Sequence, residues 1–239
     1  MARRPRKPAG RLARAASTNG PAAPTTEREK IVEALLALLA ENGIESISLA
    51  DIAARAGVTL AKLRGEFPST LAIVAAHVKA TDRAVLDHDF SDMEEEPARE
   101  RLFDVLMRRL ELLAPHRAAV RSLLRSARRN PPLGLALNAL SVRSQQLMLT
   151  AAGIGASGPR GIIRAQGLAM LFASVLRTWV DDKDSDQART MAALDRALGR
   201  GQRFVGLLDD LCYIPSRLCR LRSRRRRRDD DASEEPAAA

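Results

Sequence analysis

The sequence predicts an all-α protein of about nine helices, on three observations. Ala and Leu dominate its apolar residues, while the chain holds only five Phe, one Tyr and one Trp, and this composition favours helix over strand. Apolar residues recur at helical spacing in most segments between residues 26 and 198. No stretch alternates between apolar and polar residues as a half-buried strand would.

The four expected helices of the N-terminal part are short, and each begins at a hydroxyl residue that can cap it. These first residues are Thr26, Ser48, Thr59 and Ser69. Thr26 is followed by Glu29 in the spacing of a capping box, in which the hydroxyl and the carboxylate satisfy free amides at a helix start. Asn42-Gly43, Gly57 and Gly65 are expected to end the first three helices.

The C-terminal part carries five longer apolar stripes. They predict helices over 102–113, 116–129, 133–152, 164–179 and 185–208, the last capped by Ser185. Pro115 ends the first of these helices, and Asn130-Pro131-Pro132 ends the second. We expect a loop over 153–161, because it holds four glycines and Pro159.

The net charge of +10 is concentrated at the two ends of the chain. Residues 1–26 hold six basic residues and no acid, and residues 217–239 hold eight Arg against five acids, so the part between them is nearly neutral. We therefore predict four parts: a disordered basic arm (1–25), a helix-turn-helix domain with a connecting helix (26–90), a ligand-binding and dimerisation domain (91–212), and a disordered Arg/Asp-rich tail (213–239). The basic ends suit a polyanion such as DNA or an anionic membrane, or serve only solubility.

The sequence favours a cytoplasmic protein without a transmembrane segment. Two Cys residues at no zinc-like spacing fit a reducing compartment. The longest uninterrupted apolar stretch is 34–40, which is far shorter than the roughly 20 residues of a membrane span. His77, His88 and His116 lie on separate segments without a nucleophile or a carboxylate pair at catalytic spacing. We expect solvent-facing or capping histidines, no enzymatic activity and no cofactor or metal.

The short helices between Ser48 and Gly65 have the pattern of a helix-turn-helix, in which the second helix enters the major groove of DNA. Ala53 permits close approach of the two helices, Gly57 supplies backbone freedom at the turn, and Val58 fills the small core. By pattern alone, a generic three-helix unit remains the alternative.

Residues 31–74, IVEALLALLAENGIESISLADIAARAGVTLAKLRGEFPSTLAIV, resemble the N-terminal domain of the TetR family. The resemblance implies a DNA-binding regulator. Its phosphate contacts would be Ser48, Thr59, Thr70 and, as the main charged contact, Arg64, while Leu60, Ala61 and Lys62 would face bases. Three positions depart from the family, which usually has Tyr at 64, His or a similar residue at 65 and Lys at 70. Gly65 also weakens the end of its helix by about 1 kcal/mol relative to Ala.

A second resemblance covers part of the C-terminal half. Residues 102–117, LFDVLMRRLELLAPHR, and 176–198, LRTWVDDKDSDQARTMAALDRAL, are similar to the lipid-binding proteins of ubiquinone biosynthesis, which share the TetR-type fold. This similarity implies an alternative function, a lipid- or isoprenoid-binding accessory protein with a relict helix-turn-helix.

The leading hypothesis is a homodimeric transcriptional regulator, expected to be a repressor, with a hydrophobic small molecule or lipid as its effector. The apolar stripes predict a ligand site lined by Leu106, Leu110, Met148, Phe172 and Trp179. As the family resemblance implies, the helices over 164–179 and 185–208 are expected to form the dimer interface, so Leu171→Glu or Leu194→Glu should give monomer or aggregate.

Overall fold

A computed structural model describes residues 26–90, 93, 95–184 and 186–201 of the chain. This part of the chain is all-α and contains no strand, which confirms the predicted fold class. Its helices are α1 (Glu27–Glu41), α2 (Leu49–Ala56), α3 (Leu60–Glu66), α4 (Thr70–Leu86), α5 (Ala98–Leu113), α6 (Arg117–Arg129), α7 (Pro131–Ala151) and α8 (Gly158–Asp181), with a further helical stretch over 188–201. The predicted arm (1–25), Ser185, the end of the last predicted helix (202–208) and the predicted tail (213–239) lie outside the described residues.

The helix starts predicted in the N-terminal part are confirmed by hydrogen bonds. Thr26 and Ser48 each form a complete capping box, and the side chains of Thr59 and Ser69 each accept a bond from an amide of the first turn. Gly57 ends α2 in the left-handed region at φ 67°, which an L side chain rarely adopts. The α2–α3 turn is therefore fixed by residues that the sequence identifies.

One apolar core holds α1, α2 and α3 together. The large side chains of this core that are less than 2% exposed are Ile31, Leu35, Leu39, Ile52, Leu63, Phe67 and Ile73. Val58 packs against this cluster from the turn, as expected. Because the core reaches α3 through Leu63, the outer face of α3 is held by a packed platform.

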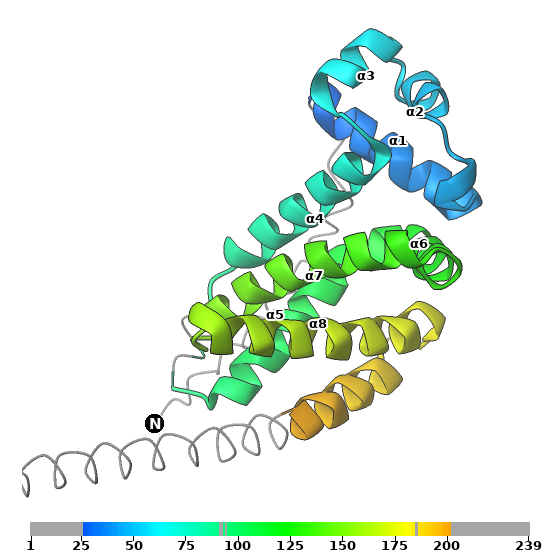
Figure 1. Ribbon diagram of the computed structural model, residues 1–239. Coiled ribbons are helices and arrows are strands. Elements are labelled where there is room, and N and C mark those ends of the chain that lie inside the picture. The colour runs from blue at the N-terminus through cyan, green and yellow to red at the C-terminus, as the bar shows by residue number, and fades with distance from the viewer. Residues whose placement is uncertain (1–25, 91–92, 94, 185, 202–239) are drawn as a thin grey trace, which may run out of the picture.

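Helix α4 connects this N-terminal head to the C-terminal bundle (Figure 1). Its first half contributes Ile73 and Val74 to the N-terminal core, and Val85 near its end belongs to the second core. Helix α6 also touches the head, because Ser122 Oγ donates a hydrogen bond to the carbonyl of Asn42 at 2.6 Å. Two separate elements thus join the head to the bundle.

The C-terminal bundle packs α5, α7, α8 and residues 188–201 around the second core. Three of its helices begin earlier than predicted, and the first of them, α5, starts at Ala98 and not at residue 102. Helix α7 starts at Pro131, capped by Asn130, and α8 starts at Gly158 inside the expected loop. In both cases proline occupies the first turn, where its missing N–H costs no hydrogen bond, so these prolines begin helices. None of the described helices is both long enough and apolar enough to span a membrane.

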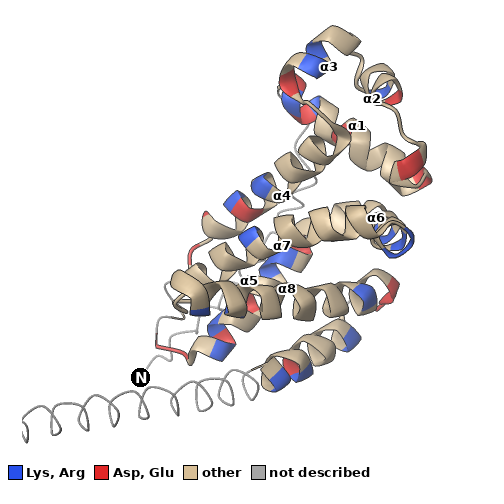
Figure 2. Ribbon diagram, viewed as in Figure 1, with Lys and Arg blue, Asp and Glu red and all other residues tan. Residues whose placement is uncertain are grey.

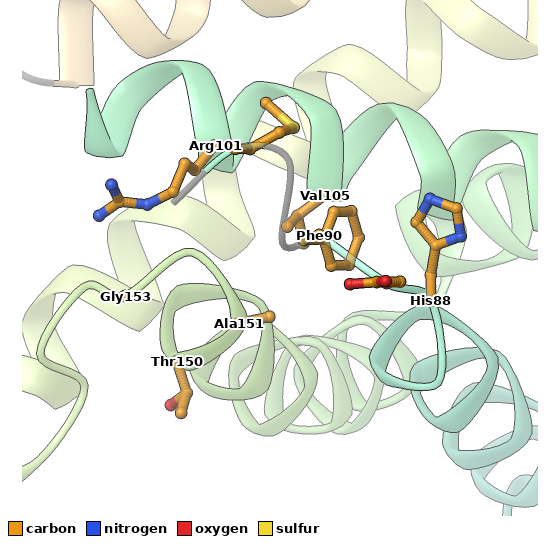
Figure 3. Close-up of a pocket in the computed structure, with 9 residues that line it drawn as sticks. His88, Phe90, Arg101, Val105, Thr150, Ala151 and Gly153 are labelled. Carbon is orange, nitrogen blue, oxygen red and sulfur yellow. The ribbon is translucent and has the colours of Figure 1, made fainter. Parts of the chain in front are cut away.

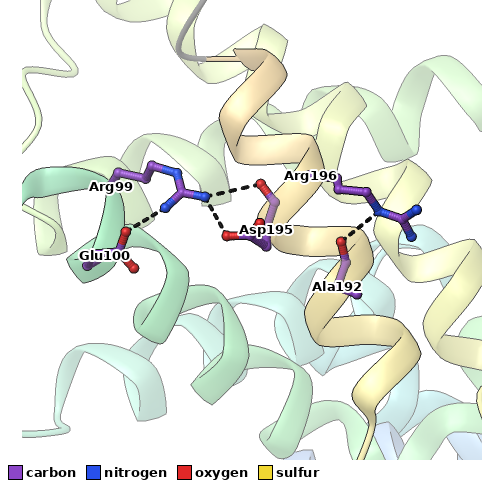
Figure 4. A network of polar contacts seen from close by, with 5 residues as sticks. All are labelled: Arg99, Glu100, Ala192, Asp195 and Arg196. Atoms are coloured by element: carbon purple, nitrogen blue, oxygen red, sulfur yellow. Dashed lines mark hydrogen bonds and ion pairs between the residues drawn. The ribbon is translucent and has the colours of Figure 1, made fainter.

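Residues 188–201 pack against α5, and this docking corrects part of the predicted dimer interface. Arg99 on α5 pairs with Glu100 and with Asp195 (Figure 4). Leu194 is fully buried in the core of its own protomer. The prediction that Leu194 lies at the dimer interface is therefore wrong, since this side chain has no surface left to offer a second copy.

Candidate nucleic-acid interface

Helix α3 presents one buried and several exposed positions at the tip of the head (Figure 1). Leu63 is its single buried residue and fixes the helix on the core. The predicted base-facing residues Leu60, Ala61 and Lys62 are all exposed, and Leu60 remains 48% exposed although it is a large apolar side chain. The three residues predicted to face bases thus lie in the first turn of an outward-facing helix.

The predicted phosphate contacts differ in how free their hydroxyl groups are. Ser48 Oγ donates a hydrogen bond of 2.6 Å to Asp51 Oδ2. Thr59 Oγ1 accepts from the Lys62 amide, which leaves its own proton available to a phosphate. Thr70 is the half-buried first residue of α4. Thr59 is therefore better prepared than Ser48 to donate to DNA.

Two ion pairs across the head involve basic residues near the tip, and neither was predicted from the sequence. Lys62 Nζ lies 2.7 Å from Glu27 Oε1, and Arg28 lies 2.9 Å from Glu66 Oε2. The hydrogen bond and charge of Lys62 lower the pKa of Glu27 below its ordinary value. The partners are separated by 35 and 38 residues in the chain, so no local pattern could reveal them. Figure 2 shows the resulting mixture of charges around α1 and α3.

Arg64, the main predicted charged contact, is exposed near the end of α3. Its Nη1 donates to the backbone carbonyl of Pro68. This bond holds the side chain along the turn that leads into α4. A phosphate would have to attract the guanidinium away from a neutral acceptor, which is a weaker competitor than a carboxylate.

The five predicted ligand-lining residues are buried together in the C-terminal core. Leu106, Leu110, Met148, Phe172 and Trp179 are each at most 3% exposed and belong to one cluster. A hollow of about 580 Å³ lies near this core (Figure 3). Its lining residues are His88, Asp89, Phe90, Met93, Arg101, Val105, Thr150, Ala151 and Gly153. The predicted residues are thus packed in the interior, and none of them lines the hollow.

A charged pair lies inside this apolar cluster, which sequence periodicity did not indicate. Asp82 on α4 and Arg109 on α5 are 6% and 5% exposed and form an ion pair. Ser144 Oγ donates to Asp82 Oδ1 at 2.7 Å, and Arg109 Nη1 lies 3.8 Å from the Met148 sulfur. The guanidinium also lies 5.7 Å from the centre of the Phe172 ring. The C-terminal core therefore has a polar centre that joins α4, α5 and α7.

The histidines do not all face solvent as predicted. His77 on α4 is half-buried and contacts His116 edge to face, with ring centres 5.1 Å apart. Burial, with His116 and Arg109 as further causes, lowers the pKa of His77 from 6.5 to about 4. His116 Nε2 lies 3.6 Å from Glu33 of α1. These residues pack at the junction of head and bundle, while His88 is exposed.

A capped outward-facing helix on a three-helix core, followed by a larger helical bundle, defines a helix-turn-helix protein with a separate C-terminal domain. Residues 31–77 match the family "Bacterial regulatory proteins, tetR family". The chain therefore has a TetR-type helix-turn-helix domain.

Solved structures agree with this assignment at the level of the fold. A TetR transcriptional regulator from Nitrosomonas europaea matches with a TM-score of 0.56 and 21% identity, over 73% of this chain and 97% of that one. A TetR transcriptional regulator from Rhodococcus sp. RHA1 matches with a TM-score of 0.50 and 22% identity, over 73% and 95%. A second Rhodococcus regulator matches with a TM-score of 0.50 and 21% identity, over 74% and 97%. The chain has the fold of TetR transcriptional regulators.

A search of curated protein sequences gave no match. The resemblance of residues 102–117 and 176–198 to ubiquinone-biosynthesis proteins finds no support among these matches.

Proposed function

We propose that this protein is a cytoplasmic, homodimeric transcriptional repressor that binds a specific DNA site and is released from it by a largely apolar ligand. The observation that carries the proposal is the exposed first turn of α3, held on a packed core by Leu63 and capped by Thr59. A helix presented in this way can enter a major groove with its N-terminal residues at base edges.

In this proposal the residues of α3 divide into two roles. Leu60, Ala61 and Lys62 face base edges, where apolar contacts and a lysine donor discriminate between base pairs. Thr59, Arg64 and, at the start of α4, Thr70 contact phosphates and set the position of the helix, with Ser48 contributing only if it exchanges its bond to Asp51.

A dimer would place two such heads on neighbouring half-sites. The large exposed apolar side chains of the outer bundle support a second copy as the partner, since they include Ile162, Ile163 and Met170 of α8 and Leu135 and Leu147 of α7. Single exposed apolar residues are ordinary, but five on two packed helices favour an interface. The proposed dimer face is therefore the outer side of α7 and α8.

Helix α4 offers the route from ligand to DNA. It carries Thr70 at the head and Asp82 and Val85 inside the bundle core. A ligand that displaces the lower part of α4 would change the separation of the two α3 helices and so weaken binding to both half-sites at once. Such a release from DNA is what a repressor requires of its effector.

DNA selection with the full chain, followed by titration at two salt concentrations, tests the proposal. We expect Lys62→Ala to relax the preference at one base position at a cost of about 1–3 kcal/mol, and Arg64→Ala to weaken all sequences alike. Lys183→Ala removes an equally exposed charge at the far end of α8 and is the matched control. If no DNA site is selected and both α3 variants bind DNA as the wild type does, the proposed regulator function is refuted.

The basic arm gives a second measurement on the same assay. Deletion of residues 2–20 should flatten the dependence of log affinity on log salt, by roughly 0.9 for each phosphate that the arm no longer neutralises. The selected sequence should stay the same, because phosphate contacts position the protein and base contacts specify the site.

A further inference from the structure

The polar centre of the C-terminal core has hydrogen-bonding capacity that its own residues do not use. Within the part of the chain that the structure describes, Arg109 Nε and Gln145 Oε1 are buried without a hydrogen-bond partner. Gln145 is 1% exposed and Arg109 is 5% exposed. A guanidinium carries five N–H donors in a fixed fork, and Asp82 occupies the Nη1 side of it. Arg109 therefore keeps an Nε edge that a further acceptor can reach.

The hollow and the polar centre lie along the same three helices. On α5 the hollow is bounded by Arg101 and Val105, and Arg109 follows Val105 by one helical turn, about 6 Å, on the same face. On α7 the hollow reaches Ala151, and Met148 and Gln145 follow it inward at intervals of three residues. The loop after α4 lines the hollow, and Asp82 lies further up that helix.

The walls between the two places are apolar and include one adaptable side chain. Val105 is 1% exposed, and Met148, 0% exposed, has its sulfur beside Arg109. Methionine rearranges more easily than branched side chains. The hollow itself has a mixed lining of polar and apolar side chains, and a chain-like ligand would pass from it between Val105 and Met148 to reach the buried Arg109.

We propose that the ligand of this domain is an amphipathic carboxylic acid, which fills the hollow with its apolar part and places its carboxylate on Arg109 in exchange for Asp82. The inference deepens the proposed function and rests on its statement that the C-terminal domain binds a ligand. Arginine binds carboxylates with two parallel N–H bonds, so an acid satisfies both the Nε edge and the charge that Asp82 now balances. A neutral head group could accept one hydrogen bond from Arg109 Nε but would carry no charge to replace that of Asp82, and a cationic head group would be repelled by the guanidinium.

The exchange has a direct consequence for α4. Asp82 is the residue of α4 that bonds both Arg109 on α5 and Ser144 on α7. When the ligand carboxylate replaces Asp82 on Arg109, Asp82 loses its counter-ion inside the core. Because an unpaired buried charge is strongly unfavourable, α4 should shift so that Asp82 reaches water. The other end of α4 adjoins α3. The ligand would therefore act on α4, the helix that connects the C-terminal core to the N-terminal head.

The test compares three probes with one chain length on the full protein: decanoate, 1-decanol and decyltrimethylammonium. Trp179 is the only tryptophan of the chain and is fully buried in the same core, so its fluorescence reports binding, with calorimetry as a second readout. We expect decanoate to bind at least about ten-fold more tightly than decanol, and the cation to bind most weakly. Equal binding of the acid and the alcohol, or preference for the cation, would overturn the proposal.

Variants separate the exchange from a general effect on packing. Asp82→Asn removes the competing carboxylate and should strengthen decanoate binding by about ten-fold without changing that of decanol. The double variant Asp82→Asn with Arg109→Met replaces the whole pair, which keeps the core foldable, and should bind acid and alcohol equally. Arg108→Gln is the matched control, because half-buried Arg108 pairs with Glu111 and not with Asp82, so its loss should leave the preference intact.

The outcome also separates this inference from the regulator function. If the protein selects a DNA site but none of the three probes binds, the acid ligand is refuted and the DNA-binding function stands. If decanoate binds with the expected preference and no DNA site is selected, the ligand site stands and the regulator function fails. Unchanged decanoate affinity in Asp82→Asn refutes the exchange itself.

Discussion

His77 should make the stability of the folded protein depend on pH between about 4 and 6.5. Its pKa is lowered from 6.5 to about 4, first by burial and then by the charges of His116 and Arg109. The folded state therefore resists protonation that the unfolded chain accepts. The stabilisation from neutral His77 is complete above pH 6.5 and is lost as the pH falls from 6.5 toward 4.

The size of the effect follows from the two pKa values. Their difference corresponds to about 3 kcal/mol in total, of which about 2 kcal/mol should be lost between pH 7 and pH 5. The groups packed around His77 are His116, its neighbour Glu33 across the junction, and Arg109. Carboxylates such as Glu27 and Glu41, whose pKa values are lowered, titrate below this range.

Urea unfolding at pH 7, 6 and 5, at one protein concentration, measures the effect. His77→Leu keeps a side chain of similar size and removes the titration, so its free energy of unfolding should fall by about 2 kcal/mol less than that of the wild type over this range. His88→Gln, at an exposed histidine, should retain the wild-type dependence. Parallel pH profiles for the wild type and His77→Leu would refute the reasoning.

Three further predictions address the interface, the packing and the charges of the head. Ile163→Glu combined with Met170→Glu should give a monomer by light scattering, because both side chains are more than half exposed on the proposed dimer face of α8. An unchanged dimer would show that the interface does not lie on this face. Gly161→Ala should lower the free energy of unfolding by about 1–3 kcal/mol, because the new Cβ would lie 2.1 Å from the Ala156 carbonyl. Gly65→Ala should raise it by about 1 kcal/mol, because the space around Gly65 is open. Chemical unfolding measures both. Glu27→Gln should raise DNA affinity a few-fold at low salt, and no change in a binding titration would show that the pair with Lys62 does not compete with DNA.

The N-terminal head could be predicted from the sequence almost to its helix ends. Its helices begin at hydroxyl caps and its turn uses Gly57, so each boundary depends on residues within a few positions of it. The start of α8 could not be predicted in this way, because it depends on a contact with another part of the chain. A Gly-rich stretch predicts a loop. Gly161 is nevertheless required inside the helix, because the backbone at Ala156 lies too close to Gly161 to leave room for a Cβ atom. Only the folded backbone shows this contact.

The candidate sites could be predicted only in part. Exposure of Lys62 and Arg64 follows from the helix pattern, but the acceptors that hold them, Glu27 and the Pro68 carbonyl, depend on the folded turn and on how α1 packs against α3. In the bundle, the stripes located the core correctly and gave no sign of Asp82 and Arg109 as a pair inside it. Charged residues on amphipathic helices are expected to face water, and their burial here depends on partners on different helices.

The departures from the TetR family pattern at 64 and 70 can be reconsidered with the charges of the head in place. Arg64 donates to a neutral carbonyl and can turn to a phosphate without leaving a carboxylate unpaired. Lys62 is held by Glu27, so a base or phosphate must replace a carboxylate that is itself exposed to water, and water screens the attraction within such an exposed pair. The intramolecular bonds of the head therefore reduce its affinity for DNA only modestly. Specificity should depend on whether the first turn of α3 fits a base sequence, while Arg64 supplies a contact common to all sequences.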